Sequence, residues 1–175
     1  MNVAMKSRAA LVLLAAFAVA SYVLGCGMQR GQQKSWPQFA ELSKDDTARL
    51  DEQRALVEAA AKEKYGAPSL AKSKSDLAIL QRIIDDHVFR KSQTYELQCL
   101  GVAFGDVLAS EFPLRWVMVT DEYGTDPTLR YKNKTIQINA LTMISKRVEQ
   151  DRPVNLADLL RITGEQLEQA EKRFK

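Results

Sequence analysis

The apolar side chains after residue 43 recur every three or four positions, which is the spacing of an amphipathic helix. Ser43 begins the first helix, because its side chain can cap the N-terminus while Asp46 lies three positions later. Gly66 ends this helix. A second helix follows Ser75, and its apolar face consists of Leu77, Leu80, Ile83, Ile84 and Val88. The pattern therefore predicts two helices that each bury one face.

A third helix, from about residue 94 to residue 112, is apolar on nearly all sides, which predicts a place at the centre of the domain. Gly101 and Gly105 are costly inside a helix, so we expect a neighbouring backbone to approach closely there. Asp106 lies in the same apolar setting and must find a hydrogen-bond donor if it is buried.

After Pro113 the period changes from that of a helix to that of a strand. Residues 115–120, 128–132 and 135–138 read as three short strands joined by tight turns, which predicts an antiparallel meander. The positions expected to face the core are Leu129, Tyr131, Ile136 and Ile138, and those expected to face solvent or a partner are Arg130, Lys132, Thr135 and Gln137.

Helical spacing returns after the strands, in a fourth helix that ends before Pro153 and a fifth that Asn155 caps. Residues 163–166 have the pattern of a capping box, which predicts a short terminal helix. The chain therefore predicts an α+β fold: a three-stranded antiparallel meander with helices before and after it, packed on one face.

The first 26 residues have the pattern of a secretory signal peptide, with a basic head followed by an uninterrupted apolar run over residues 9–20. The sequence Val-Leu-Gly-Cys at residues 23–26 resembles the lipobox of bacterial lipoprotein precursors. That resemblance implies cleavage between Gly25 and Cys26 and attachment of diacylglycerol to the Cys26 thiol. The alternative is an uncleaved anchor made of residues 9–25, although this run is short for a membrane span.

These segments predict a signal peptide over residues 1–25, a lipidated cysteine with a flexible tether over residues 26–42, and one α+β domain over residues 43–175. In the resembled lipoproteins an Asp after the cysteine indicates retention in the inner membrane. Here Gly27 follows, which favours the outer membrane and a domain that faces the periplasm. Trp36 and Phe39 could contact lipid headgroups, but packing onto the domain is the favoured interpretation.

The charge changes the picture little, since cleavage before Cys26 removes Lys6 and Arg8 and takes the net charge from +3 to about +1. Such a neutral chain argues against a nucleic-acid partner. Lipidation of Cys26 would leave Cys99 as the one free cysteine, and an apolar setting favours a buried, inert thiol over a reactive one. One cysteine and one histidine also cannot build a zinc site without several carboxylates.

Candidate chemistry is sparse. His87 is the single histidine of the chain, and a core-edge histidine is the favoured interpretation over a catalytic one. Asp121, Glu122 and Asp126 surround the first turn of the meander and form a candidate ligand cluster, although turns also select such residues. The chain has no nucleophile elbow, His-Glu-x-x-His motif or phosphate loop. We therefore expect no catalytic residue, no cofactor and no metal.

Three blocks of the sequence, in order, resemble the bacterial family catalogued as domain of unknown function 3806. They are Leu100-Gly101-x-x-x-Gly105-x-x-Leu108, Trp116-Val117-x-Val119-x-Asp121-Glu122-Tyr123-Gly124 and Leu141-Thr142-Met143-Ile144-Ser145-Lys146-Arg147-Val148-Glu149. The resemblance covers about residues 75–160. It implies a fold, and no activity comes with it.

The expected function is that of a membrane-anchored periplasmic lipoprotein with a non-enzymatic, protein-binding domain, for example of the immunity or inhibitor type. Arg130, Lys132 and Gln137 form the candidate partner surface. Two alternatives remain open. One is a hydrolase or transferase that acts on envelope material through His87 or the acidic turn, and the other is a structural component of an envelope complex.

Overall fold

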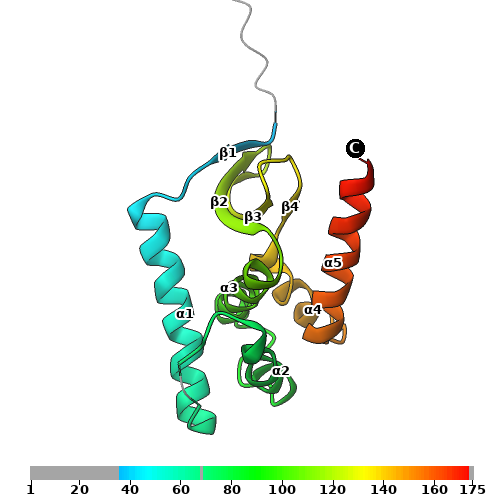
Figure 1. Cartoon of the computed structure of the whole chain (residues 1–175). Coiled ribbons are helices and arrows are strands. Elements are labelled where there is room, and N and C mark those ends of the chain that lie inside the picture. Colours follow the sequence, from blue (N-terminus) through cyan, green and yellow to red (C-terminus); the bar gives the residue numbers. More distant parts are fainter. Residues whose placement is uncertain (1–35, 68, 174–175) are drawn as a thin grey trace, which may run out of the picture. The chain divides into compact units, whose positions relative to one another are not determined.

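A computed structural model describes residues 36–67 and 69–173 of the chain (Figure 1). The elements are β1 (Gln38–Ala40), α1 (Lys44–Tyr65), η1 (Lys74–Asp76), α2 (Leu77–Asp85), α3 (Thr94–Glu111), β2 (Leu114–Asp121), β3 (Gly124–Tyr131), β4 (Gln137–Ile138), η2 (Ala140–Thr142), α4 (Ser145–Glu149) and α5 (Leu156–Arg173). The order of helices, meander and helices confirms the predicted α+β class.

The sheet has four strands in the described part of the chain, one more than the sequence predicted. They lie in the order β1-β2-β3-β4, and every neighbouring pair is antiparallel. The additional strand is β1, in which Gln38 pairs with Thr120 and Ala40 with Met118. It falls within residues 26–42, where the sequence predicted a tether. Three residues are too few to display an alternating pattern, which is why the strand was missed.

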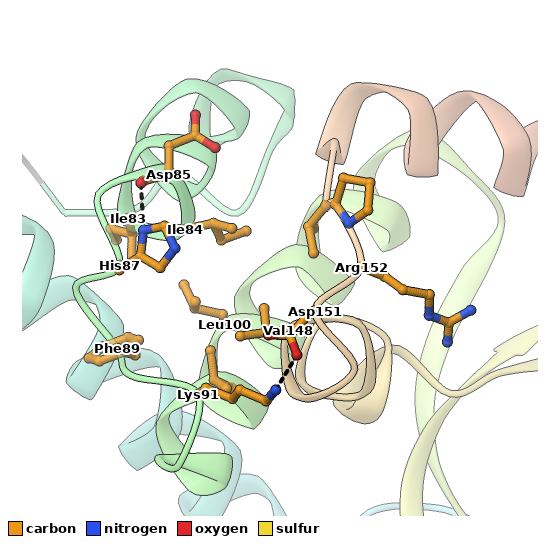
Figure 2. A pocket seen from close by; sticks show the side chains of 13 residues that line it. Ile83, Ile84, Asp85, His87, Phe89, Lys91, Leu100, Val148, Asp151 and Arg152 are labelled. Carbon is orange, nitrogen blue, oxygen red and sulfur yellow. Dashed lines mark hydrogen bonds and ion pairs between the residues drawn. The ribbon is translucent and has the colours of Figure 1, made fainter.

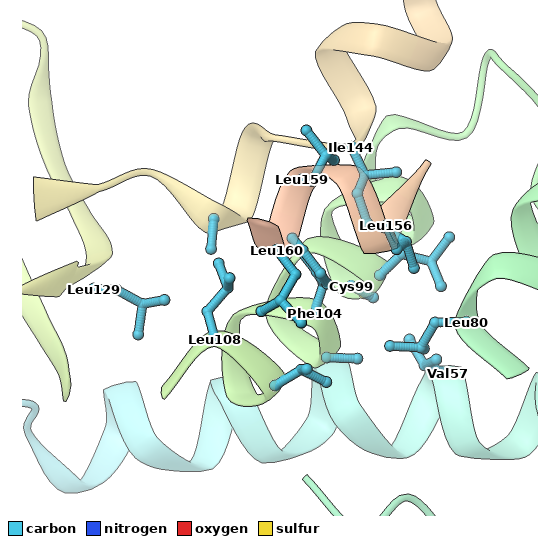
Figure 3. Close-up of a cluster of buried hydrophobic side chains, with 14 of the residues drawn as sticks. Val57, Leu80, Cys99, Phe104, Leu108, Leu129, Ile144, Leu156, Leu159 and Leu160 are labelled. Carbon is cyan, nitrogen blue, oxygen red and sulfur yellow. The ribbon is translucent and has the colours of Figure 1, made fainter. Parts of the chain in front are cut away.

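Helix α3 is the centre of the domain, as its apolar sequence predicted. Every residue from Cys99 to Leu108 is buried. Figure 3 shows side chains from the surrounding elements meeting on it, among them Val57 of α1, Leu80 of α2 and Leu129 of β3. Helix α5 adds Leu156 and Leu160 to the same core. Because all of these elements bury their apolar faces against one helix, the position of α3 determines theirs.

The two glycines of α3 allow close approach, and the structure identifies what approaches. A Cβ atom on Gly101 would lie 2.4 Å from the carbonyl oxygen of Leu141, so the backbone of η2 rests on the helix there. A Cβ atom on Gly105 would lie 2.4 Å from the ring of Trp116. The expectation of a neighbouring backbone is therefore met at Gly101, whereas at Gly105 the neighbour is an indole side chain.

The first helix begins and ends where its sequence predicted. The amide of Asp46 donates to Ser43 Oγ at 3.0 Å, and the amide of Ser43 donates to Asp46 Oδ2 at 3.1 Å. The hydrogen bonds from Ser43 hold the pKa of Asp46 below its ordinary value. At the other end Gly66 has a φ of 62°, and its amide donates to Lys62 O at 2.8 Å. This is the left-handed helix end that favours glycine.

Two helix boundaries differ from the prediction. Ser73, and not Ser75, opens the second helical segment, because its amide donates to Asp76 Oδ2 at 3.3 Å at the start of η1. Helix α5 runs without interruption, so the predicted short terminal helix at residues 163–166 is wrong. A Cβ atom on Gly164 would lie 3.0 Å from the ring of Phe112, so this glycine serves packing and does not end a helix.

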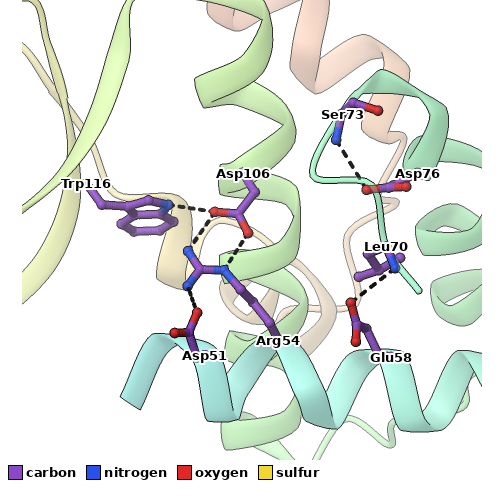
Figure 4. A network of polar contacts seen from close by, with 8 residues as sticks. All are labelled: Asp51, Arg54, Glu58, Leu70, Ser73, Asp76, Asp106 and Trp116. Atoms are coloured by element: carbon purple, nitrogen blue, oxygen red, sulfur yellow. Dashed lines mark hydrogen bonds and ion pairs between the residues drawn. The ribbon is translucent and has the colours of Figure 1, made fainter. Parts of the chain in front are cut away.

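The buried carboxylate of Asp106 finds the donors that its position required (Figure 4). Arg54 of α1 donates to it twice, from Nε to Oδ2 at 2.6 Å and from Nη2 to Oδ1 at 2.8 Å. Trp116 of β2 donates from Nε1 to Oδ1 at 2.9 Å. The hydrogen bonds from Arg54 to Asp106 raise the pKa of Arg54. The carboxylate thereby joins α1, α3 and β2 at one point.

Replacing Asp106 with Ala should lower the free energy of unfolding by about 3–5 kcal/mol, because it removes the buried carboxylate that accepts two hydrogen bonds from Arg54, whose side chain is 12% exposed, and one from Trp116. Urea denaturation of the full chain measures this loss. The matched control is Asp51→Ala, which removes a 60% exposed carboxylate from the same guanidinium and should cost about 0–1 kcal/mol. Equal losses for the two variants would contradict the role given to Asp106.

Candidate functional site

A cavity of about 540 Å³ lies between the end of α2, the face of α3 and the segment that follows α4 (Figure 2). Most of its lining is apolar, and Leu100 and Val148 are part of that lining. The polar residues of the lining are Asp85, His87, Lys91, Asp151 and Arg152. This size and this mixture of a mainly apolar wall with a few polar groups are typical of ligand pockets.

The end of α2 places His87 at the cavity. The amide of His87 donates to Ile84 O at 3.1 Å, and the amide of Val88 donates to Ile83 O at 3.1 Å. This pair of bonds is the Schellman motif, in which the residue after the cap takes the left-handed conformation. His87 occupies that place with a φ of 52°. A non-glycine residue there costs about 1–2 kcal/mol, so the imidazole is held at this position against a backbone preference.

The end of α4 repeats the arrangement on the opposite wall. The amide of Asp151 donates to Val148 O at 3.1 Å, and the amide of Arg152 donates to Arg147 O at 2.8 Å. Asp151 takes the left-handed conformation with a φ of 54°. Two helix ends of the same type, each with a polar residue where glycine is favoured, therefore face one cavity.

The imidazole of His87 is oriented by a backbone carbonyl. Its Nδ1 lies 2.8 Å from Asp85 O. A carbonyl oxygen can only accept a hydrogen bond, so Nδ1 carries the hydrogen and donates it. Figure 2 shows the other ring nitrogen on the side of the cavity. The residue is exposed and lies beyond the end of the helix, whereas the sequence placed it at the edge of the core.

Two contacts tie the walls together at one side of the cavity. Lys91, in the loop before α3, forms an ion pair with Asp151. Thr94 Oγ1, in the first turn of α3, donates to Glu149 Oε1 at 2.7 Å. Both contacts join the segment after α2 to the end of α4, and they hold the two walls at a set distance.

Gln81 joins the walls on the other side. Its Nε2 donates to Val154 O at 2.9 Å, and its Oε1 accepts from the amide of Leu156 at 2.8 Å. The same Nε2 donates to Asp85 Oδ1 at 2.8 Å. One amide side chain of α2 thus fixes the segment between α4 and α5 and also occupies the carboxylate of Asp85.

The candidate ligand cluster at the first turn of the meander does not line this cavity. Asp121 Oδ1 accepts a hydrogen bond from the amide of Tyr123 at 2.8 Å, which is turn chemistry. Glu122 and Asp126 are exposed. In residues 36–67 and 69–173, no three side chains of the types His, Cys, Asp and Glu lie close enough together to hold a metal ion.

Of the candidate partner surface, Arg130 is occupied within the domain. It donates from Nε to Lys134 O at 2.7 Å and from Nη2 to Asn133 O at 2.9 Å. Its guanidinium lies 4.3 Å from the centre of the Phe39 ring. Phe39 therefore packs on the sheet, as the sequence favoured, while Trp36 stays 46% exposed.

Lys132 and Gln137, the other two residues of that candidate surface, are also engaged or covered. Lys132 pairs with Glu171, and this contact raises the pKa of Lys132 and lowers that of Glu171. The Oε1 atom of Gln137 is buried and has no hydrogen-bond partner in the described part of the chain. The structure thus gives Arg130 and Lys132 roles that hold the fold together.

Gly25 and Cys26 lie outside the described residues. Cys99 is buried in α3 with no exposed surface, as the sequence predicted. None of the helices within residues 36–67 and 69–173 is long and apolar enough to cross a membrane.

The comparisons with known proteins bear on the fold and on the place of the cavity. Residues 76–159 match the family model described as "Domain of unknown function (DUF3806)". The cavity-lining residues, from Ile83 to Val154, all fall within this segment. No curated protein matches the chain.

A solved structure of a protein from Bacteroides thetaiotaomicron VPI-5482 is similar to this chain, with a TM-score of 0.65 and 17% sequence identity. The similarity covers 76% of this chain and 49% of that one, so the chain spans about half the length of the protein it matches. At this identity the likeness shows the fold alone.

The thiol of Cys99 should be unreactive in the folded protein. Burial, and to a smaller extent the charge of Glu96, raises the pKa of Cys99 to about 11. Only about one thiol in a thousand is then ionised at pH 8, and the thiolate is the reactive form. Titration with an aromatic disulfide reagent measures this as the difference between the chain and its Cys99→Ala variant. That difference should appear only in denaturant, and rapid labelling of Cys99 in the folded chain would contradict its burial.

Proposed function

Residues 76–159 belong to the domain of unknown function 3806 family, and from that premise we propose that the chain is a lipid-anchored periplasmic protein whose domain binds a protein partner without catalysis. The observation that carries the proposal is the cavity between the ends of α2 and α4. It is built within the family segment, it is mainly apolar, and helix ends position its polar groups. An immunity or inhibitor protein is one form of such a module.

Binding is favoured over catalysis by the composition of the lining. A general base acts on a nucleophile or a substrate proton within hydrogen-bond reach. The described residues that line the cavity include no Ser, Thr, Tyr or Cys that His87 could activate, and Lys91 pairs with Asp151. Asp85 accepts a hydrogen bond from Gln81. These contacts shape the walls of a pocket, which is what a binding module requires.

The proposed localisation of the protein rests on its N-terminal sequence. The lipobox-like residues end at Cys26, where the lipid would be attached, and Gly27 favours the outer membrane. Residues 27–35 can span at most about 30 Å, so the domain would remain close to the membrane surface. A partner held there would also be an envelope or periplasmic protein.

Metabolic labelling with a radioactive fatty acid tests the anchor. The chain should incorporate label and sediment with membranes, whereas Cys26→Ser should lose both properties because it removes the thiol that accepts the lipid. Cys99→Ser is the matched control and should keep the label. Membrane sedimentation of Cys26→Ser without label would show instead that residues 9–25 act as an uncleaved anchor.

Cross-linking in cells, followed by capture through a C-terminal tag, tests the partner. One protein should be captured in stoichiometric amount and should be lost from Val148→Phe, because the larger side chain fills the cavity that Val148 lines. Ile162→Phe is the matched control, since Ile162 is 37% exposed on α5 and does not line this cavity.

The same capture compares the cavity with the candidate partner surface on the sheet. A partner that Val148→Phe retains and that Lys132→Ala loses would place the contact on the sheet and would overturn the role of the cavity. Circular dichroism of each variant establishes that the loss does not come from unfolding.

A further inference from the structure

The four charged side chains of the lining carry no net charge, because Asp85 and Asp151 are acidic and Lys91 and Arg152 are basic. Asp151 pairs with Lys91, and the carboxylate of Asp85 accepts from Gln81 at 2.8 Å. In Figure 2 the guanidinium of Arg152 points away from the cavity. A ligand that enters this space therefore meets a lining without net charge, which favours a neutral ligand because burial of an unpaired ion is costly.

The imidazole of His87 offers the cavity a hydrogen-bond acceptor. Because Nδ1 donates to Asp85 O at 2.8 Å, the neutral ring carries its lone pair on Nε2. Nε2 is the ring nitrogen that Figure 2 shows on the cavity side. The complementary ligand atom is an N–H or O–H donor.

The rest of the lining is apolar and mainly aliphatic. Its apolar members include Ile83, Ile84, Leu97, Leu100, Val148 and Val154. A space of about 540 Å³ with such walls accommodates aliphatic side chains, which gain free energy when they leave water.

We propose that the cavity binds a neutral peptide segment of the partner, with an aliphatic side chain packed against the apolar lining and a backbone N–H donated to Nε2 of His87. A polypeptide carries both groups on one residue, so a single residue can pack its side chain on the apolar lining and donate its backbone N–H to His87. This inference rests on the proposed function and names the chemistry of the segment that is bound.

The backbone conformation of His87 allows a substitution that removes the ring without harming the fold. Its φ of 52° lies in the region that glycine adopts freely, so His87→Gly should fold at least as well as the natural chain. Lys72 has a φ of 54°, is exposed and does not line the cavity. Lys72→Gly therefore makes the same backbone change elsewhere and is the matched control.

The probe is N-acetyl-leucinamide, which has a leucine side chain, amide donors and no charge. Saturation-transfer NMR with the full chain should show saturable binding with a dissociation constant in roughly the millimolar range. His87→Gly should weaken binding about 3- to 10-fold, as expected for one hydrogen bond. Lys72→Gly should leave binding unchanged, and an equal effect of both variants would overturn the role of His87.

Nitrogen NMR provides a readout that a merely structural histidine would not give. His87 is the single histidine of the chain, so the imidazole signals belong to it alone. The free protein should show hydrogen on Nδ1, and N-acetyl-leucinamide should shift the Nε2 resonance. Hydrogen on Nε2 in the free neutral ring would overturn the proposal.

Three related probes test the chemistry of the ligand. N-acetylglycinamide lacks the side chain and should not bind saturably. Equal or tighter binding of 4-methylpentanoate or of 3-methylbutylammonium would overturn the proposal in favour of an anionic or a cationic ligand. If no probe binds while Val148→Phe still abolishes partner capture, the ligand class is wrong but the proposed function stands. If partner capture is also unaffected by Val148→Phe, both fail.

Discussion

A carboxylate inside an apolar helix must receive hydrogen bonds, and this requirement at Asp106 governs how the domain is assembled. The donors come from two other elements, Arg54 of α1 and Trp116 of β2. Arg54 donates two hydrogen bonds to this carboxylate and Trp116 donates one. Together these bonds fix how α1 and the sheet lie against α3. Leu97 and Leu100, earlier on the same helix, form one wall of the cavity.

The second wall depends on the glycine at position 101. With no side chain there, the backbone of η2 rests directly on α3, and α4 follows it along the chain. The end of α4 is thereby brought opposite the end of α2, and the side chain of Gln81 holds the next segment in place. The cavity thus results from the close approach of the η2 backbone to α3, and no sequence motif predicts it.

Much of the fold could be predicted, because its signals are local or periodic. The capping box at Ser43, the apolar α3 and the need of Asp106 for a donor are all visible in the sequence. Strand β1 was not predictable, since three residues carry no period and their pairing partner lies about 80 positions away. The cavity was not predictable either, because it joins residues from Ile83 to Val154 that only tertiary packing brings together.

Among the described residues, four non-glycine residues take the left-handed conformation, and two of them, His87 and Asp151, line the cavity from opposite walls. Glycine would satisfy both helix ends at lower cost in backbone energy. At both helix ends the chain has a polar side chain where the backbone favours glycine. Such departures from backbone preference are typical of functional sites. In Asp151 the retained side chain pairs with Lys91 and closes one side of the cavity. In His87 it provides an oriented imidazole, and an oriented acceptor above an apolar floor is what selective binding of a neutral segment requires.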